Sequence, residues 1–360
     1  MKILITGNMG YVGPVVVDHL RTVFPDAVLI GYDMAYFAPY LTNVSILPEA
    51  KLNMQLFGDV RSIPPSTFQG VDCVVHLAAI SNDPMGNKYE DVTLEINHKS
   101  SIKLAQMAKD AGVSSFVFAS SCSMYGSADD SAKTERATLN PLTAYARSKV
   151  FTEKELEILA DENFIITCLR FATACGMSDR LRLDLVLNDF VAGAVANGKI
   201  NILSDGSPWR PLIHVKDMAR AIEWAIHRKA SLGGNFLAIN TGSDSWNFQV
   251  KDLAKAVVDL IPGTSFSINK DAPPDKRSYK VDFNFYKSLA PNHQPLYTLE
   301  KTILELYQAL TNMKFGDNDF RNSLLMRLKV LTSLQESNKI DHELKWIDKK
   351  IKPKEKTMVA

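Results

Sequence analysis

The chain of 360 residues lacks three features that would point directly to a function: an excess of charge, clustered cysteines and long apolar runs. Lysine and arginine number 41 against 40 aspartates and glutamates, so the net charge of +1 gives no global field to attract nucleic acid or an anionic membrane. None of the four cysteines has the spacing of a metal site or a C-x-x-C pair. We therefore expect reduced thiols, no bound metal and no nucleic-acid partner.

The sequence also has no segment that reaches the roughly 20 consecutive apolar residues needed to span a bilayer. Its first residues, MKILITGNMGYVG, are apolar for only a few positions before glycines interrupt them, which is too short for the core of a signal peptide. These absences predict a cytoplasmic protein with no membrane partner. Its 46% hydrophobic residues suffice for a large core shared by two lobes.

In the first half of the chain, short apolar runs alternate with helical patterns. Such runs are typical of a parallel sheet whose two faces are both covered by helices. The sequence therefore predicts an α/β fold with a Rossmann-type doubly wound parallel sheet. The predicted strands are Lys2–Thr6, Ala27–Asp33, Asp72–Ala79, Ser115–Ser121 and Phe164–Phe171.

The rhythm of strands and helices changes after Gly176, which indicates a second lobe. We expect an NAD-binding domain over 1–176, to which 208–245 return. A smaller C-terminal α/β lobe, formed by 177–207 and 246–348 and including a helical extension, should bind the substrate. The lysine-rich residues 349–360 are expected to form a flexible tail.

Three glycines follow the first strand and open the first helix. Gly7 permits a tight turn, Gly10 lets the backbone approach a diphosphate, and Gly13 lets the helix pack closely on the strand. Asp33 ends the second strand about 20 residues later, where a carboxylate accepts hydrogen bonds from a ribose. Because a carboxylate there repels a 2′-phosphate, the pattern favours NAD over NADP.

A second constellation has the composition of a proton-transfer site. Tyr145 and Lys149 are four residues apart in a helical stretch, so they share one face. We expect Lys149 to lower the pKa of Tyr145 from about 10 toward the working pH, as a general base requires. Ser121 ends the strand before this helix, where ligands bind in an open α/β sheet, and its hydroxyl can relay a proton to Tyr145.

Taken together, these motifs resemble those of the extended short-chain dehydrogenases/reductases, specifically the NAD-dependent epimerase/dehydratase group that acts on nucleotide sugars. The resemblance runs from Met1 to about Asp282. It is carried by TGNMGYVG, HLAAISNDP, SSCSMYG, YARSK, LRFATACG, WRPLIHVKDMARA and PDKRSYKVDF, in that order.

The resemblance implies a set of binding residues. Asp59 and Val60 should lie near the adenine, and Arg210 and Arg277 should grip the diphosphate of a nucleotide sugar. The residues expected at NAD are Gly7, Gly10, Tyr11, Val12, Gly13, Asp33, Asp59, Val60, Leu77, Ala78, Ala79, Asn97, Ser120, Tyr145, Lys149 and Phe171. Those expected at the sugar nucleotide are Ser81, Ser121, Cys122, Ser123, Tyr145, Thr173, Asn188, Arg210 and Arg277.

Several of these residues also fit structural roles. Ser120 and Ser123 are equally suited to capping a loop, and Asn188 suits a buried structural amide nearly as well as a nucleotide contact. His214 fits a packed strand residue better than a catalyst.

The departures from the group's pattern bear on the reaction. Members that are 4,6-dehydratases carry carboxylates just after the active-site hydroxyl residue, where this chain has Cys122 and Ser123. Dehydration by that route is therefore disfavoured. Thr173 and Ala174 replace the Asn-Pro of galactose-type epimerases. The sequence therefore does not identify the sugar of the substrate.

Three functions remain open from the sequence. The first is a nucleotide-sugar 4-epimerase, in which hydride leaves C4 and returns to the opposite face. The second is an NAD-dependent oxidoreductase on the same substrates, either a 4-keto reductase or a dehydrogenase. The third, a non-catalytic NAD-sensing protein, is disfavoured because a sensor needs no Ser121/Tyr145/Lys149 proton relay.

The family resemblance also implies a homodimer. Two helices, Ile96–Lys109 and Tyr145–Leu159, are expected to pair with their symmetry mates as a four-helix bundle. The side chains proposed for this contact are Leu104, Met107, Ala108, Val150 and Leu156.

Overall fold

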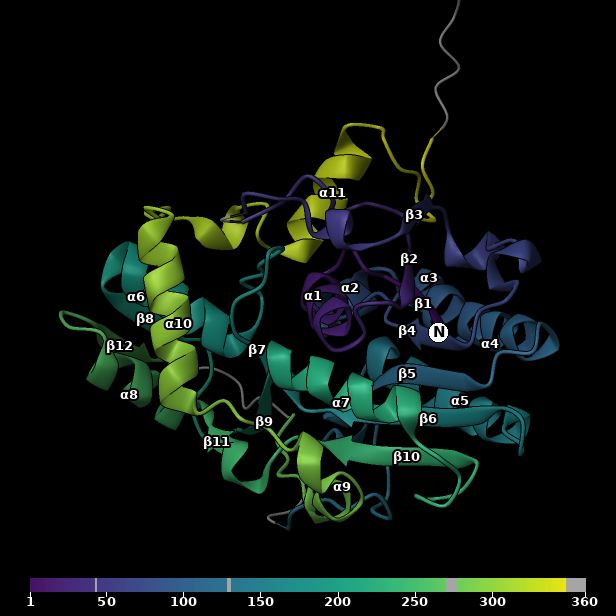
Figure 1. Ribbon diagram of the computed structural model, residues 1–360. Coiled ribbons are helices and arrows are strands. Elements are labelled where there is room, and N and C mark those ends of the chain that lie inside the picture. Colours follow the sequence, from purple (N-terminus) through teal and green to yellow (C-terminus); the bar gives the residue numbers. More distant parts are fainter. Residues whose placement is uncertain (43, 128–130, 270–276, 348–360) are drawn as a thin grey trace, which may run out of the picture.

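The computed structural model describes residues 1–42, 44–127, 131–269 and 277–347 (Figure 1). The segment expected to be a flexible tail, 349–360, lies outside the described residues.

A seven-stranded parallel sheet forms the first lobe, in the order β10-β6-β5-β4-β1-β2-β3. The order reverses direction at β1 and β4, as in a doubly wound sheet, so the predicted Rossmann-type fold is confirmed. Each predicted strand is present within two or three residues at its ends. The strands are β1 (Lys2–Thr6), β2 (Val28–Asp33), β3 (Met54–Phe57), β4 (Cys73–His76), β5 (Ser115–Ser121), β6 (Ile165–Phe171) and β10 (Phe236–Thr241).

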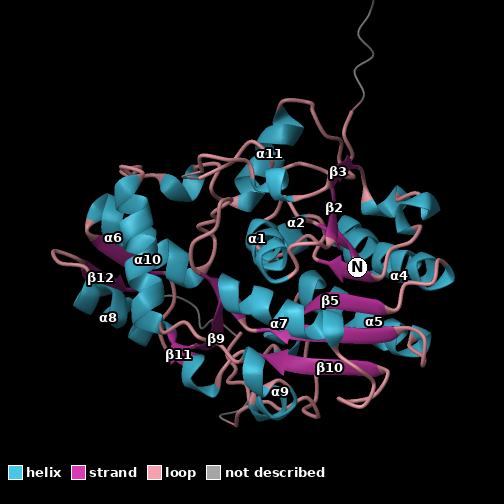
Figure 2. Cartoon of the chain, in the orientation of Figure 1, coloured by secondary structure: helices cyan, strands magenta, loops and turns pink. Residues whose placement is uncertain are grey.

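Helices cover both faces of this sheet (Figures 1 and 2). On one face, α1 (Gly13–Val23) and α7 (Val215–His227) bury their apolar sides in one core cluster. On the other face, α4 (Ser100–Asp110) and α5 (Ala144–Leu159) bury theirs in a second cluster. Between β4 and α4 the chain forms α2 (Asp83–Lys88), α3 (Glu90–Leu94) and a π-helical turn, Glu95–Lys99.

The second lobe has its own apolar core. Its helices are α6 (Val186–Asn197), α8 (Val250–Leu260) and α10 (Leu299–Asn312), and they pack beside a two-stranded parallel sheet of β8 (Lys199–Ile202) and β12 (Ser265–Ile268). A separate three-stranded sheet has the order β11-β9-β7; its strands are β7 (Thr173–Cys175), β9 (Trp209–His214) and β11 (Asn247–Gln249).

The predicted lobe boundaries need correction at three places. Of the segment 208–245, α7 packs on the first lobe's sheet and β10 joins it beside β6. Strand β9 instead pairs with β7 and β11 in the separate three-stranded sheet. The short helix α9 (Asn284–Leu289) packs into the core under α7. The terminal helix α11 (Arg327–Glu336) packs in the first lobe against α2 rather than in the second lobe.

Within the described part of the chain, no helix combines the length and apolar character needed to cross a membrane.

Candidate functional site

A cavity of about 810 Å³ opens at the carboxyl ends of the strands, between the two lobes. The ends of β1, β2, β5 and β6 contribute Gly7, Asp33, Ser121 and Phe171 to its wall. This is where an open α/β sheet binds ligands, because the strand order reverses there.

The glycine turn is shaped for close approach of a ligand to the backbone. Gly7 has a φ of +76°, and a Cβ there would lie 2.5 Å from the backbone nitrogen of Ala78. A Cβ on Gly13 would lie 2.1 Å from the carbonyl oxygen of Asn8, so only glycine lets α1 start this close to β1. Gly10, Tyr11 and Val12 complete a cavity wall at the N-terminus of α1, where free N–H groups favour an anion. These features fit a dinucleotide diphosphate.

Asp33 is held rigidly at the adjacent strand end. Its carboxylate accepts hydrogen bonds from the backbone N–H of Met9 at 3.0 Å and of Ala35 at 2.7 Å. Burial raises the pKa of this carboxyl group, and these two N–H groups oppose that rise. Neither contact uses both lone pairs of an oxygen, so the carboxylate keeps acceptor capacity for ribose hydroxyls.

The other residues expected around NAD mostly line the cavity. Val60, Leu77, Ala78 and Ala79 do so, and Asp59 also caps a 3₁₀ turn by accepting from the backbone N–H of Arg61 at 2.9 Å. The carboxylate of Asp59 is further paired with the Arg61 guanidinium at 2.6 Å.

Tyr145, Ser121 and Lys149 converge in the cavity wall as predicted. Helix α5 places Tyr145 and Lys149 one turn apart, after the Thr143 side chain caps its first turn. The Lys149 ammonium lies 5.7 Å from the centre of the Tyr145 ring and donates to the carbonyl oxygen of Ala119 at 2.6 Å. The Ser121 side chain lies close enough to the Tyr145 phenol to lower its pKa.

The pKa of Tyr145 differs from the expectation. Burial raises it to about 12, with the Ser121 hydrogen bond opposing the rise. Burial also lowers the pKa of Lys149 to about 8, opposed by the nearby Glu153 carboxylate. In the protein alone the pKa of Tyr145 therefore lies above its usual value, because desolvation outweighs the groups that lower it. The effect of Lys149 on this pKa stays a prediction.

Three residues expected to touch a ligand have structural roles instead. The Asn97 side chain is buried and bridges both backbone groups of Ile80, at 2.8 and 2.9 Å, so it fixes the loop after β4 from behind. The Cys122 thiol points into the core and donates to the carbonyl oxygen of Arg170. Asn188 is fully buried among Gly176, Arg182 and Tyr11, where backbone and side-chain contacts satisfy its amide. Sequence spacing could not show that these side chains point away from the cavity.

Ser120 reaches the cavity wall, but its hydroxyl donates to the buried Glu153 at 2.5 Å. Glu153 is paired in turn with Arg170 at 2.7 Å. This buried network fixes the end of β5 against α5, so it supports the positions of Ser121 and Lys149. The Ser123 hydroxyl also lies in the wall and has no hydrogen-bond partner among the described residues.

The sugar-nucleotide side of the cavity contains the expected Ser81, Thr173, Arg210 and Arg277. Arg277 is paired with Asp83 at 2.6 Å, and Arg210 donates to the Arg277 carbonyl oxygen.

Sequence reasoning missed a buried polar cluster on this side. Arg182, which is 5% exposed, is paired with Asp184 at 2.6 Å and donates to the Ser81 hydroxyl at 2.9 Å. Asn82 donates to Asp184 at 2.6 Å. The alternation of Arg and Asp after Gly176 was the available signal, but charged residues in a polar loop are usually exposed.

Comparison with known proteins agrees with this geometry. Residues 3–242 match the model of the NAD dependent epimerase/dehydratase family. A UDP-glucose 4-epimerase of Yersinia enterocolitica is 30% identical over 268 residues, which span 68% of this chain and 78% of that protein. A dTDP-glucose 4,6-dehydratase of Streptomyces griseus is 26% identical over 230 residues, spanning 61% and 68%. A solved NAD-dependent NDP-hexosamine 5,6-dehydratase of tunicamycin biosynthesis shares the fold, with a TM-score of 0.75, 21% identity and coverage of 88% and 99%.

Proposed function

Because the chain belongs to the NAD-dependent epimerase/dehydratase family of extended short-chain dehydrogenases/reductases, we propose that this NAD-dependent enzyme is a nucleotide-sugar 4-epimerase. The observation that carries the proposal is the convergence of Ser121, Tyr145 and Lys149 in the wall of the cavity that also contains the glycine turn. Bound NAD supplies the hydride acceptor and, in the return step, the hydride donor.

The chain's own residues perform the proton transfers. The base is Tyr145 in its phenolate form: Ser121 gives its hydroxyl proton to the phenolate oxygen as it takes the proton of the C4 hydroxyl, so Tyr145 becomes a phenol and the sugar oxygen loses its proton. Lys149 is fixed by the Ala119 carbonyl, so its charge stays near Tyr145 and favours the phenolate that acts as the base. When hydride returns to the other face of the 4-keto sugar, the same phenol gives the proton back.

The arrangement of carboxylates favours epimerisation over dehydration. The position after Ser121 holds a buried thiol, Cys122, and the next holds the hydroxyl of Ser123. Among the residues that the structure describes, Asp83, Asp184 and Asp189 also line the cavity, and each is paired with an arginine. A dehydratase needs a carboxyl group that is free to protonate the leaving oxygen and a base for the C5 proton.

A direct test begins with the small molecules that the purified protein carries. We expect mass spectrometry after denaturation to find retained NAD. With UDP-glucose as the first substrate, chosen from the Yersinia relative, we expect interconversion with UDP-galactose and no net production of NADH. Steady NADH production would instead identify a dehydrogenase, consumption of NADH with a 4-keto substrate would identify a reductase, and a 4-keto-6-deoxy product would identify a dehydratase.

A further inference from the structure

The C-terminal helix brings a buried cation to the cofactor cavity. Arg327, the first residue of α11, is 1% exposed and contributes to the cavity wall with Met326 and Leu331. Its Nη2 donates to the carbonyl oxygen of Arg180 at 2.7 Å. Its Nη1 has no hydrogen-bond partner among the described residues.

Arg327 differs from most other buried arginines in having no ion-paired carboxylate in the described part of the chain. Arg180, whose Nε also lacks a hydrogen-bond partner among the described residues, is paired with Glu49. Arg170 and Arg182 each face a carboxylate, Glu153 and Asp184. Arg228, at the amino end of the sheet, has no carboxylate in its hydrogen-bond set, but it donates to four backbone carbonyls and the Thr167 hydroxyl. A buried guanidinium with an orphan nitrogen is costly unless a ligand supplies the missing acceptor.

The charges around Arg327 leave a cationic excess. Arg180 and Arg182 influence it electrostatically, and their partners are Glu49 and Asp184, so three guanidinium groups face two carboxylates. Burial and the neighbouring arginines lower the pKa of Arg327 to about 9, opposed by Asp184, so the surroundings disfavour the charged form of Arg327. An anion placed here would remove the cost.

The position of Arg327 indicates which anion fits. Its guanidinium stacks on the ring of Phe37, 4.4 Å away, in the loop that follows Asp33 at the adenosine end. On the other side it is within electrostatic range of Arg182, which lies near Tyr145, and of Tyr11 in the glycine turn. The diphosphate of a dinucleotide lies between its adenosine and nicotinamide ends. We propose that Arg327 binds the diphosphate of NAD, so that the C-terminal segment completes the cofactor site.

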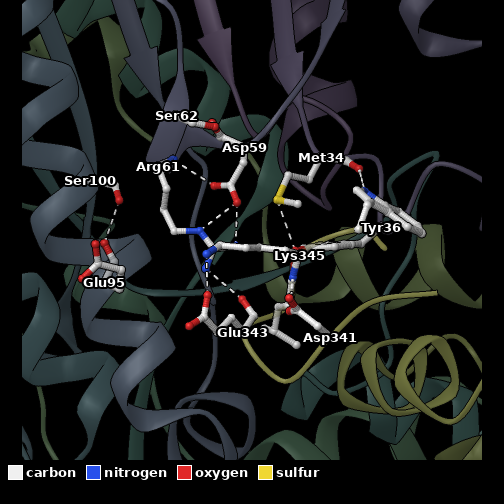
Figure 3. A network of polar contacts seen from close by, with 12 residues as sticks. Met34, Tyr36, Asp59, Arg61, Ser62, Glu95, Ser100, Asp341, Glu343 and Lys345 are labelled. Carbon is white, nitrogen blue, oxygen red and sulfur yellow. Dashed lines mark hydrogen bonds and ion pairs between the residues drawn. The ribbon is translucent and has the colours of Figure 1, made fainter. Parts of the chain in front are cut away.

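Hydrogen bonds hold the rest of the C-terminal segment against the part of the protein where the adenosine is expected to bind (Figure 3). The Trp346 indole N–H donates to the carbonyl oxygen of Met34 at 2.6 Å, and the Tyr36 hydroxyl donates to the Leu344 carbonyl oxygen. Arg61 lies between the Asp59 carboxylate and the Glu343 carbonyl oxygen, to which it donates at 2.8 Å. Residues 326–346 therefore form a strap along this part of the cavity, outside the 3–242 segment that matches the family.

The test measures NAD binding and not turnover, so its outcome is independent of the reaction assigned above. NAD affinity is measured by calorimetry on cofactor-free protein, or by the NAD release rate if the cofactor does not come off. Arg327→Met should weaken NAD and ADP-ribose by about 10- to 100-fold, the range for loss of a charge-assisted hydrogen bond. Arg327→Lys should lie between it and the wild type, and UDP affinity should be unchanged in both.

Arg228→Met is the matched control, a second buried arginine distant from the cavity. Its Tm should fall because four carbonyl oxygens lose their donor, while NAD affinity stays at the wild-type value. By contrast, Arg327→Met should keep or raise the Tm of the cofactor-free protein, since it removes an uncompensated charge. Unchanged NAD affinity in Arg327→Met and Arg327→Lys would overturn the proposal. A loss of affinity for UDP alone would also overturn it and would assign Arg327 to substrate binding.

Discussion

At the scale of single residues, the catalytic group depends on burial as much as on its partners. The Tyr145 phenol has a pKa raised to about 12 by desolvation, yet Ser121 and Lys149 lie beside it. A group of this kind holds its proton until positive charge is added nearby or its hydrogen-bond partner changes. The nicotinamide ring of NAD⁺ carries a positive charge and would supply it if the ring bound beside Tyr145.

Replacing Tyr145 by Phe tests this assignment because it removes only the hydroxyl. Turnover should fall by about 10² to 10⁴-fold, the usual effect of losing a general acid–base group, while Tm and NAD affinity stay near wild type. The measurement is steady-state turnover on the authentic sugar nucleotide, with a thermal melt and a cofactor titration on the same preparation. Near-normal turnover in Tyr145→Phe would place the proton relay elsewhere.

Two companion variants separate the roles of its neighbours. Lys149→Met should lower turnover and also weaken NAD, since Lys149 lies near both the phenol and the cofactor end of the wall. Ser121→Ala should be milder because a water molecule can replace one hydroxyl in a relay.

At the scale of elements, one ion-paired cluster joins the two lobes. Glu305 on α10 accepts from the His214 imidazole at the end of β9, at 2.7 Å, and from the Lys216 ammonium at the start of α7. His214 also stacks on Tyr297, with ring centres 3.8 Å apart. This arrangement supports the interpretation of His214 as a structural residue and places its partner on a helix more than 80 residues away.

The cluster predicts a specific pH dependence of stability. Burial by itself raises the pKa of Glu305. The hydrogen bonds from His214 and Lys216 outweigh this effect and lower the pKa from 4.5 to about 2. A carboxylate with a lowered folded-state pKa contributes stability above its unfolded pKa and loses it as the pH falls toward the folded one. Glu305→Gln should therefore be about 1–3 kcal/mol less stable than wild type at pH 7, and the difference should vanish between about pH 4.5 and 2.

Urea unfolding of wild type and variant at several pH values measures this difference. Glu300→Gln, an exposed carboxylate on the same helix, serves as the control and should show little change with pH. A pH-independent difference for Glu305→Gln would mean that the carboxylate's charge contributes nothing to the junction.

At the scale of the whole molecule, the predicted dimer contact has to be revised. Leu104, Ala108 and Leu156 are fully buried in the core of the first lobe, because α4 and α5 pack these side chains onto the sheet. Along the outer face of α5, Phe151 is 40% exposed and Ile158 is 80% exposed, seven residues apart and hence on one side. We retain the homodimer as a proposal and assign its contact to this exposed face.

Sedimentation should give about twice the 40.0 kDa chain mass at micromolar concentration. Ile158→Glu should shift the mass toward the monomer because it places a charge in the apolar contact. Ile46→Glu, at another exposed apolar residue outside α5, should leave the dimer intact. A wild-type mass near 40.0 kDa would contradict the homodimer itself.

The sequence by itself determined the parallel sheet, the glycine turn and the convergence of Ser121, Tyr145 and Lys149. These depend on local spacing and on strand ends that the fold brings to one edge, and both are written in short segments of the chain. Tertiary structure alone decided which side chains face the cavity. Three side chains expected at the ligand instead hydrogen-bond within the protein behind the cavity wall: Asn97, Cys122 and Asn188. Arg327, near the other end of the chain, lies in the wall itself. The reason is physical: the direction of a side chain and the pKa of a buried group depend on neighbours distant in sequence, which no local pattern specifies.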